Sequence, residues 1–586
     1  MFKKERQQLD DQIHMILDGL ELISAKLNWN WIPFSGHWGI STSLFEIASI
    51  NREFEQDLSV KDRAQIIASK IAEKIDELVG FEKIEPVNGY LNFYFKSEDY
   101  SQQVIGEILK KSEIFGKGED TNRTIMVEFS QPNTHKAFHV GHLRTMVLGS
   151  SVCRILEFAG NEVIRANYIG DIGLHVIKWL WNYMNFHDGE TPPEDGQTRW
   201  MGDIYSEAIK RLEKDPELEA DVRELFIKWD KKEPEIVALW KKTRNWSLDA
   251  FKEMYSFLDI HFDRIYYESE VEEPGKVIVD ELIEKGLAVD ERPKGAVIVD
   301  LDKLSGTKEK YRVLVILRSD GTSLYPTKDI PLAIMKFSEY ELDQSVYVID
   351  VRQSLYLKQI FRILELMGYE WAANCYHLAY EIVNLPGNVT ISSREGTVVL
   401  LDDLLSEAEK RAAKIVEEKN PEIDKKIKSE VAKKVALGAI KYSLLSRDNT
   451  KIITFDWDAA MDVNGQAAPY IQYAYVRANS ILKKVKFSIP EPEGIYRDLS
   501  VAEIQLVDML ARFPQEVQRA SKDMRPLLIS NYSYELAKTF SNFYNLCPVL
   551  SDEDEVRNFR LRLVAAFRQV VSNSLTLLGI EVPNLM

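Results

Sequence analysis

The side chains best suited to chemistry in this sequence form a histidine cluster between residues 130 and 142. Of the nine histidines in the chain, His135, His139 and His142 fall in this segment, and Gly141 lies between the last two. Two imidazoles beside a glycine could bind and neutralise a triphosphate whose leaving group gains negative charge. The same histidines could instead cap a helix or bind zinc, and HxGH alone does not decide between these interpretations. Zinc would need further ligands at short spacing, and none follows.

The segments around the cluster predict a β-strand, a helix and a second strand. Residues 124–129 are β-branched and apolar, residues 143–156 repeat apolar side chains at helical spacing, and residues 162–168 are again strand-like. This order is typical of a parallel sheet with a right-handed crossover. Such sheets bind ligands at the carboxyl edge of their strands, where a helix N-terminus offers free N–H groups to a phosphate. We therefore expect a nucleotide site here, with Gly141 allowing close approach to the backbone.

The rest of the chain divides into regions of different composition. Residues 183–268 are polar and rich in Trp, Lys and Glu, which indicates a helical insertion. Strand-like runs return at Val313–Leu317, Ser345–Ile349 and His377–Val383, and we expect them to complete the sheet. The predicted domains are a small mixed domain at 1–115, a parallel-sheet domain at 116–400, a helical connector at 401–460 and a helical domain at 461–586.

Composition excludes several classes of protein. With 586 residues, of which 45% are apolar and 28% charged, the chain has the composition of a multidomain globular protein. No apolar run reaches the ~18 residues of a membrane helix, and the charged first residues lack a signal-peptide pattern. Three scattered cysteines, Cys153, Cys375 and Cys547, cannot form a disulfide framework or a Cys-based zinc cluster. We therefore expect a protein of the reducing cytoplasm.

The net charge of −18 argues at first against a nucleic-acid partner, but the charge is unevenly distributed. Residues 461–586 carry 14 basic and 14 acidic side chains. The preceding 460 residues therefore carry the whole acidic excess. The C-terminal region is electrically distinct from the rest, so the total charge does not exclude a polyanionic partner for that region.

Six short motifs, in order along the chain, resemble one known family. His139–His142 (HVGH) resembles the HIGH signature of class I aminoacyl-tRNA synthetases, and the wider string from Val127 to Thr145 is similar to that of arginyl-tRNA synthetases in particular. The other motifs are Gly170–Gly173 (GDIG), Leu317–Thr322 (LRSDGT) with Tyr325 and Asp329, Tyr347–Gln353 (YVIDVRQ), Gly465–Ala474 (GQAAPYIQYA) and Ser533–Leu550. Chance or a bare nucleotidyltransferase explains only the first motif.

The resemblance implies an α/β fold with a Rossmann-type parallel-sheet catalytic domain and a helical insertion. It also implies a small α+β N-terminal domain that contacts tRNA and an all-α anticodon-binding domain of the DALR type. The implied activity is ATP-dependent arginine–tRNA ligation, in which arginyl-adenylate forms and the terminal adenosine of tRNA(Arg) takes the arginyl group. The implied partners are ATP with Mg²⁺, L-arginine and tRNA(Arg), with no tightly bound metal, no membrane and a monomeric state. A site that pairs a carboxylate with guanidinium needs no editing domain.

The same resemblance assigns roles to individual residues. Those expected to hold ATP are His139, Gly141, His142, Ser392 and Ser393. Those expected around arginine are Glu128, Gln131, Pro132, Asn133, His142, Tyr325, Asp329 and Gln353. Those expected to contact tRNA are Tyr470, Gln472, Tyr473 and Arg477.

Within the arginine site, the resemblance places Asp329 and Tyr325 at the guanidinium. Glu128 and Gln353 are expected at the amino-acid end and its surroundings, and Asn133 at the α-carboxylate or α-amino group. Carboxylate and carbonyl acceptors suit a guanidinium, which is planar, always charged and rich in donors. Taken singly, Tyr325 could instead be a core residue and Asp329 could cap a helix that begins nearby.

The second class I signature, KMSKS, is altered in this chain. Thr390–Thr397 reads TISSREGT, with Thr390 and Ser393 where the family pattern has lysines. Because the second lysine usually neutralises the pyrophosphate leaving group, we hypothesise that Lys136, just upstream of HVGH, takes its place. Arg394 is the second candidate. The alternatives are that Lys136 is a solvated loop charge, and that the protein is another class I synthetase or a catalytically inactive tRNA-binding paralogue.

Overall fold

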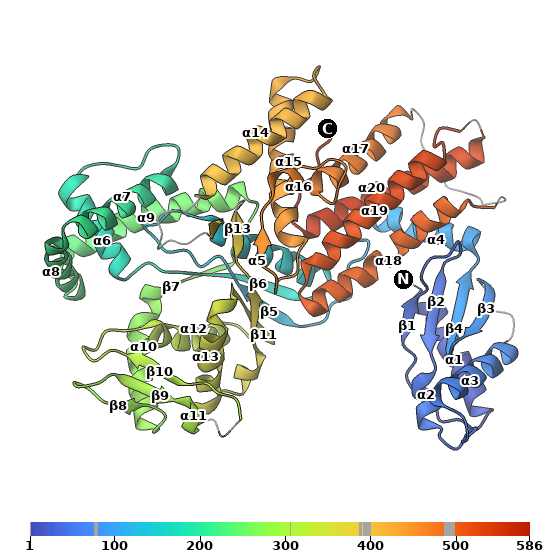
Figure 1. The fold of residues 1–586 in the computed structure, drawn as a ribbon, viewed down its shortest axis with the longest axis horizontal. Helices are drawn as coiled ribbons and strands as arrows, with labels where there is room; N and C mark the ends of the chain where they lie inside the picture. Colours follow the sequence, from blue (N-terminus) through green and yellow to red (C-terminus); the bar gives the residue numbers. More distant parts are fainter. Residues whose placement is uncertain are drawn as a thin grey trace.

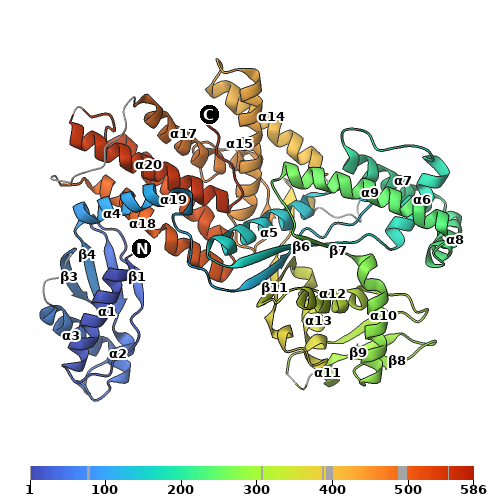
Figure 2. The ribbon, with the colours of Figure 1, turned by 180° about the vertical axis from the view of Figure 1, so that it is seen from behind.

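The computed structural model describes residues 2–75, 80–304, 306, 308–385, 389–390, 400–485, 498–551 and 553–586. Ser392, Ser393 and Arg394 lie outside these residues. The molecule is elongated, with a small N-terminal domain at one end and the helices α6 to α9 at the other (Figures 1 and 2). The parallel sheet and the C-terminal helices lie between these two ends.

The N-terminal domain is a four-stranded antiparallel sheet with helices, as the sequence predicts for a small mixed domain. The strands pair in the order β1-β2-β4-β3. Large aromatic side chains such as Trp38, Phe93 and Phe95 are buried in its core. Its elements are α1 (Lys3–Asp18), β1 (Trp29–Trp31), β2 (Gly39–Ser43), α2 (Phe45–Ile50), α3 (Val60–Lys74), β3 (Phe81–Val87), β4 (Tyr90–Phe95), α4 (Ser97–Lys111) and η1 (Ser112–Ile114).

A five-stranded parallel sheet forms the centre of the next domain, which confirms the predicted Rossmann-type fold. Its strand order is β12-β11-β5-β6-β7, and every neighbouring pair is parallel. Helix α5 packs closely on β5, because a Cβ at Gly149 would lie 2.3 Å from the ring of Phe129. The strands are β5 (Thr124–Glu128), β6 (Glu162–Ile169), β7 (Arg264–Tyr267), β11 (Gln344–Asp350) and β12 (Cys375–Tyr380), and the crossover helices include α5 (Val140–Phe158) and α13 (Ser354–Leu366).

Two sequence-based expectations about this sheet are corrected. Arg264–Tyr267, inside the range expected to be an insertion, is the edge strand β7. Val313–Leu317 is a strand, β10, but it pairs antiparallel with β9 in a separate small sheet. Two of its apolar side chains, Val313 and Val315, are 49% and 40% exposed, which would not suit a strand covered on both faces.

The insertion consists of helices between β6 and β7, with a core rich in tryptophan. Trp179 and Trp240 are buried in it, and Trp200, Trp229 and Trp246 pack around them. Its elements are α6 (Leu174–Phe186), α7 (Gln197–Lys214), η2 (Pro216–Leu218), α8 (Glu219–Asp230) and α9 (Pro234–Phe257).

A second group of elements lies between β7 and the connector helices, below the sheet in Figure 1. Helices α10 and α12 cross closely here, and a Cβ at Gly275 would lie 1.9 Å from the carbonyl oxygen of Thr327. The elements of this group are α10 (Glu268–Glu284), β8 (Val289–Asp290), β9 (Val297–Asp300), α11 (Leu301–Leu304), β10 (Val313–Leu317), α12 (Tyr325–Glu339), η3 (Val351–Gln353) and η4 (Glu370–Asn374). A separate three-stranded sheet, in the order β14-β13-β15, consists of β13 (Val383–Leu385), β14 (Val389–Thr390) and β15 (Ile453–Thr454).

The C-terminal third is helical, as predicted. In α20 the expected apolar face is buried, from Val556 through Phe567 to Leu577, and Gly579 follows the helix with a positive φ of 66°. None of the described helices is both long and apolar enough to cross a membrane. The helices are α14 (Leu401–Lys419), α15 (Lys425–Leu445), α16 (Trp457–Ala460), α17 (Ala468–Lys484), α18 (Val501–Asp523), α19 (Pro526–Leu546) and α20 (Asp554–Leu577).

Candidate active site

Two of the clustered histidines form a reciprocal cap at the N-terminus of α5. The backbone N–H of Gly141 donates to Nδ1 of His139 at 3.1 Å, and the N–H of His139 donates to Nδ1 of His142 at 3.2 Å. The two rings stack with centroids 3.9 Å apart. Because both Nδ1 atoms accept hydrogen bonds, each neutral ring carries its proton on Nε2. The capping interpretation is therefore correct, and it still leaves two N–H donors for a ligand.

Burial and the neighbouring cations favour the neutral form of both imidazoles. Burial lowers the pKa of His139 to about 4, and the charge of Lys136 acts in the same direction. Burial, His139 and Lys136 together lower the pKa of His142. A Cβ at Gly141 would lie 2.8 Å from Cε1 of His139, so a larger residue there would displace the His139 ring. In this neutral form the two rings offer Nε2–H donors, and a nearby lysine or arginine would add positive charge to the site.

Lys136 supplies a positive charge next to the histidine pair. Its Nζ lies 4.9 Å from the ring centroid of Tyr205 on α7, a cation–π distance. Within the described part of the chain, Lys136 has no ion pair with a carboxylate. The side chain is partly buried, and burial lowers its pKa. These contacts differ from those of a solvated loop lysine.

The third histidine of the cluster has a structural role. His135 is fully buried, and its backbone N–H donates to Oγ of Ser247 at 2.9 Å. Its Nε2 lies 2.9 Å from Oγ1 of Thr243, and both partners are on α9. His135 therefore fastens the loop after β5 to the insertion.

Close contacts also join the loops after β5 and β6. The N–H of Gly170 donates to the carbonyl of Pro132 at 3.0 Å, and Asn133 forms a parallel bridge with Gly170. A Cβ at Gly170 would lie 2.3 Å from Oδ1 of Asn133. Gln131 has a positive φ of 47°, which turns the chain sharply after the strand. The residues of this loop are thus held at the carboxyl edge of the sheet.

Buried carboxylates collect at the same edge of the sheet. Glu128, the last residue of β5, is 2% exposed, and Gln131 Nε2 donates to its Oε1 at 2.9 Å. Its other oxygen accepts a hydrogen bond from Lys336 Nζ, a fully buried lysine of α12. Lys336 Nζ also lies 4.1 Å from the ring centroid of Tyr347 on β11.

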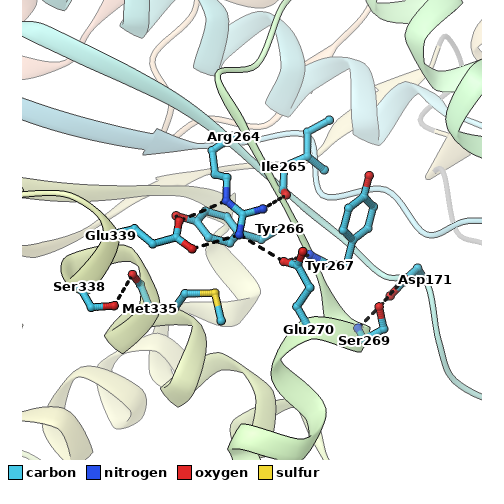
Figure 3. A network of polar contacts seen from close by, with 10 residues as sticks. All are labelled: Asp171, Arg264, Ile265, Tyr266, Tyr267, Ser269, Glu270, Met335, Ser338 and Glu339. Atoms are coloured by element: carbon cyan, nitrogen blue, oxygen red, sulfur yellow. Dashed lines mark hydrogen bonds and ion pairs between the residues drawn. The ribbon is translucent and has the colours of Figure 1, made fainter.

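Asp171, from the GDIG motif, caps helix α10 and thereby orients a second acid. Ser269 donates to Asp171 through its backbone N–H at 2.9 Å and its hydroxyl at 2.7 Å (Figure 3). Asp171 also pairs with Arg244 at 3.0 Å. Glu268, the residue before Ser269, is the second acid, and it pairs with Lys328 Nζ at 2.8 Å.

Arg264 joins the elements that frame this region. It pairs with Glu339 of α12 at 3.1 Å and with Glu270 of α10 at 3.5 Å (Figure 3). Because Arg264 begins β7, these ion pairs fix both helices to the edge of the sheet. The position of the acids on α10 and α12 is therefore set by the edge strand that the sequence did not predict.

Asp329 lies inside α12 and does not cap it, so the capping alternative is wrong. The hydroxyl of Tyr356 donates to its Oδ2. Burial raises the pKa of Asp329 to about 7, and the nearby Glu128 and Glu268 act in the same direction. Tyr325, at the start of α12, is 71% exposed, so it is not a core residue. Gln353, in η3 after β11, is also exposed.

Comparison with known proteins identifies the family. Residues 104–457 match the family described as tRNA synthetases class I (R), catalytic domain, and residues 471–586 match the DALR anticodon binding domain. The chain belongs to the arginyl-tRNA synthetase family.

Curated relatives and solved structures agree with this family. Arginine–tRNA ligase of Alkaliphilus metalliredigens is 35% identical over 89% of this chain and 90% of its own. The ligase of Clostridium botulinum (strain Alaska E43 / Type E3) is 36% identical over 87% of this chain and 90% of its own. Arginyl-tRNA synthetase of Thermus thermophilus superposes with a TM-score of 0.79 at 28% identity, covering 99% of this chain and 100% of that one. These matches exclude the alternatives of a bare nucleotidyltransferase and of a synthetase of another specificity family.

In the helical domain of this synthetase, three of the four expected tRNA contacts lie near the surface of α17. Arg477 Nη2 donates to the hydroxyl of Tyr473 at 3.2 Å, and its guanidinium lies 4.9 Å from the ring centroids of both Tyr473 and Tyr544. Tyr470 is partly buried, and its hydroxyl donates to Ser541 at 3.2 Å. Tyr544, 39% exposed, joins this group and was not predicted.

The fourth expected tRNA contact, Gln472, is corrected to a structural role. Its side chain is fully buried. Its Nε2 donates to the carbonyls of Lys434 at 3.2 Å and Glu581 at 2.7 Å. Through these two hydrogen bonds Gln472 ties α15 to the C-terminal segment. Because its side chain is fully buried, a tRNA could not reach it in this structure.

Several residues of the synthetase site were not found from the sequence. Lys328, Lys336 and Tyr356 pair with acids of the site, and Glu268 is the acid that pairs with Lys328. None of the four belongs to a motif used in the sequence analysis. Lys336 follows Asp329 by seven residues, or two helical turns, and this spacing was the one available signal.

Proposed function

We propose that this protein is an arginine–tRNA ligase that consumes ATP, as its magnesium complex, together with L-arginine and tRNA(Arg). The observation that carries the proposal is the joint position of two features in a chain of this family. A neutral histidine pair lies at the N-terminus of α5, and buried carboxylates lie at the same carboxyl edge of the sheet. The first feature suits a triphosphate and the second suits a cationic amino acid.

In the first step an oxygen of the arginine carboxylate attacks the α-phosphorus of ATP. A new oxygen–phosphorus bond forms, the bond to the bridging oxygen breaks, and pyrophosphate leaves. His139 and His142 donate from Nε2 to phosphate oxygens and need no change of protonation state. Lys136 offsets the negative charge that develops on the pyrophosphate. The second lysine of KMSKS usually has this role, and this chain has Ser393 in its place. Ser392, Ser393 and Arg394 are proposed to assist at the phosphates.

Arginine recognition is proposed to use Asp329 for the guanidinium, with Tyr325 beside it. Tyr356 orients the carboxylate of Asp329 through its hydrogen bond. The amino-acid end is proposed to meet Glu128 and Asn133. Gln131, Pro132, His142 and Gln353 are proposed to complete the surroundings of arginine.

In the second step a ribose hydroxyl of the tRNA's terminal adenosine attacks the acyl carbon of the adenylate, and AMP leaves. The α17 group of Tyr470, Tyr473 and Arg477 is proposed to contact the anticodon stem-loop, because Arg and aromatic side chains suit phosphates and unstacked bases. The N-terminal domain is proposed to contact another part of the tRNA. We further propose that the protein acts as a cytoplasmic monomer, for which sedimentation of the free protein and of its tRNA complex is the test.

Pyrophosphate exchange, run with each amino acid and with or without tRNA, tests the proposal. We expect exchange with arginine and with no other amino acid. As the family resemblance implies, we expect it only when tRNA(Arg) is present. Exchange with a different amino acid would contradict the specificity. Tight tRNA binding without exchange or aminoacylation would instead support the inactive paralogue.

A further inference from the structure

Helix α7 of the insertion packs directly on the loop that carries Lys136. A Cβ at Gly202 of α7 would lie 2.6 Å from Cβ of Ala137, so the helix backbone approaches this loop closely. Tyr205 of the same helix is partly buried, and its ring centroid lies 4.9 Å from Nζ of Lys136. Because Gly202 and Tyr205 are three residues apart, they lie on one face of α7. That face therefore meets two consecutive residues of the loop.

The N-terminal end of α7 is fixed to the start of α14. The hydroxyl of Thr198 donates to Oδ2 of Asp402 at 3.1 Å, and Arg199 forms an ion pair with Asp403. Both acids lie in the first turn of α14. Helix α7 is therefore anchored by contacts that do not involve Lys136.

The start of α14 also contacts the loop between Lys136 and α5. The N–H of Leu401 donates to the carbonyl of Phe138 at 3.0 Å, and Leu400 forms an antiparallel bridge with His139. The loop, α7 and α14 thus each contact the other two. This arrangement fixes the position of α7 relative to the histidine pair.

An aromatic ring can hold a lysine without neutralising it. The face of the ring attracts the ammonium, but it carries no net charge and leaves the three N–H donors able to bind oxygen atoms. A carboxylate in the same place would neutralise the ammonium and accept its hydrogen bonds. The charge of Lys136 acts on three nearby imidazoles, because it lowers the pKa of His139, His142 and His175. The ammonium therefore has the ring of Tyr205 and these histidines as neighbours.

We infer that Tyr205 is a positioning residue, which holds the ammonium of Lys136 beside the histidine pair and leaves its charge available to a phosphate. The inference rests on the proposed role of Lys136 in arginine activation. It gives the insertion a function in that step, because α7 places the lysine through Tyr205 and needs no contact of its own with ATP.

The test measures kcat for tRNA-dependent pyrophosphate exchange in variants of Tyr205. Tyr205→Leu removes the ring and keeps an apolar side chain, so kcat should fall about tenfold, the size of a partly buried cation–π contact. KM for arginine should stay within about twofold, because Lys136 acts on the leaving group and not on the amino acid. Tyr205→Phe keeps the ring and should stay within about threefold of the wild-type kcat.

A double variant separates a role through Lys136 from a general structural role. Lys136→Ala/Tyr205→Leu should have a kcat within about threefold of that of Lys136→Ala alone, because the lysine that Tyr205 positions is already absent. A structural role would instead lower kcat again by the whole factor seen in Tyr205→Leu. Phe186→Leu is the matched control: the Phe186 ring centroid lies 3.9 Å from the guanidinium of Arg211, farther along α7, and loss of this cation–π contact should leave kcat unchanged.

Thermal unfolding of each variant separates loss of fold from loss of rate, and Tyr205→Met, which also lacks a ring, replaces Tyr205→Leu if the latter does not fold. A near wild-type kcat in the folded ringless variant, or a double variant in which the two losses multiply, overturns the inference. A near wild-type kcat for Lys136→Ala overturns the proposed role of Lys136 instead. Failure of the wild-type protein to activate arginine overturns the proposed function as a whole.

Discussion

At the scale of single residues, the proposed phosphate-binding and charge-neutralising roles are divided between different side chains. Burial and the mutual cap favour the neutral form of His139 and His142. Lys136 is the cation beside them, and its contact with Tyr205 on the insertion limits where its ammonium can lie. This contact supports our proposal that Lys136 takes the place of the lysines missing from the KMSKS position.

Replacing Lys136 tests this division of roles. Lys136→Ala should lower kcat for tRNA-dependent pyrophosphate exchange by an amount equivalent to roughly 2.7–4 kcal/mol, because a charge that stabilises the leaving group is lost. Lys242→Ala is the matched control, since Lys242 lies 5.0 Å from the ring centroid of Trp246 in the same insertion. A near wild-type kcat for Lys136→Ala would show that another cation neutralises the pyrophosphate.

The raised pKa of Asp329 predicts a pH-dependent arginine affinity. Burial raises this pKa to about 7, so the carboxylate that is proposed to bind the guanidinium becomes protonated below neutral pH. KM for arginine should therefore rise about tenfold from pH 8 to pH 6, while KM for ATP changes much less.

A variant of Tyr356 provides the control for this pH profile. The Tyr356 hydroxyl stabilises the carboxylate form, so Tyr356→Phe should move the rise in KM for arginine to higher pH. Asp329→Asn should give a high KM for arginine that does not rise further as the pH falls. A flat profile in the wild-type protein would mean that Asp329 is ionised throughout the range.

At the scale of elements, the crossing of α10 and α12 positions the acids and their counter-ions. Glu268 begins α10, and Lys328, Asp329 and Lys336 lie on α12. The helices approach so closely at Gly275 that a side chain there would overlap the backbone of Thr327. A small change at this crossing would therefore alter the geometry of the whole carboxylate cluster.

Gly275→Ala tests the importance of this crossing. Because the added Cβ would lie 1.9 Å from a backbone oxygen, the helices must move apart, at a cost of about 1–3 kcal/mol in the free energy of unfolding. KM for arginine should rise together with the loss of stability. Gly106→Ala in α4 is the control, since nothing lies within 4 Å of its added Cβ. Equal arginine KM values in both variants would show that the crossing does not position the site.

The same elements show what could be predicted from the sequence. The position of His139 and His142 followed from the strand–helix pattern, which depends only on local periodicity. The edge strand Arg264–Tyr267 could not be predicted in this way. It has four residues, begins with a charged side chain and lies in a polar region, so it shows little of the apolar alternation that indicates a strand. The pairing of Lys336 with Glu128 was also unpredictable, since it depends on how α12 packs against the end of β5, 208 residues away in the chain.

At the scale of the whole molecule, ion pairs within the protein reduce the number of cations that the described part of the C-terminal region can offer to a phosphate. Several of its basic residues are already paired with acids of the protein. Examples are Arg512 with Asp508, Arg525 with Asp448 and Arg560 with Glu503. The 14 basic side chains of residues 461–586 are therefore more numerous than the cations available to a phosphate.

The distribution of free cations predicts a moderate salt dependence of tRNA affinity. In the described part of α17, Arg477, Lys483 and Lys484 have no ion pair with a carboxylate, and about three phosphate contacts correspond to a log–log slope of roughly −2 to −3. Arg477→Ala should make the slope shallower by roughly one unit or less. Lys538→Ala should change it little, because Lys538 pairs with Glu535 at 3.7 Å. Filter binding between 50 and 200 mM salt, about the range over which such slopes are resolved, measures both slopes. A wild-type affinity that is insensitive to salt would contradict the role of this helix, because an acidic protein can hold a polyanion only where its local cations release counter-ions.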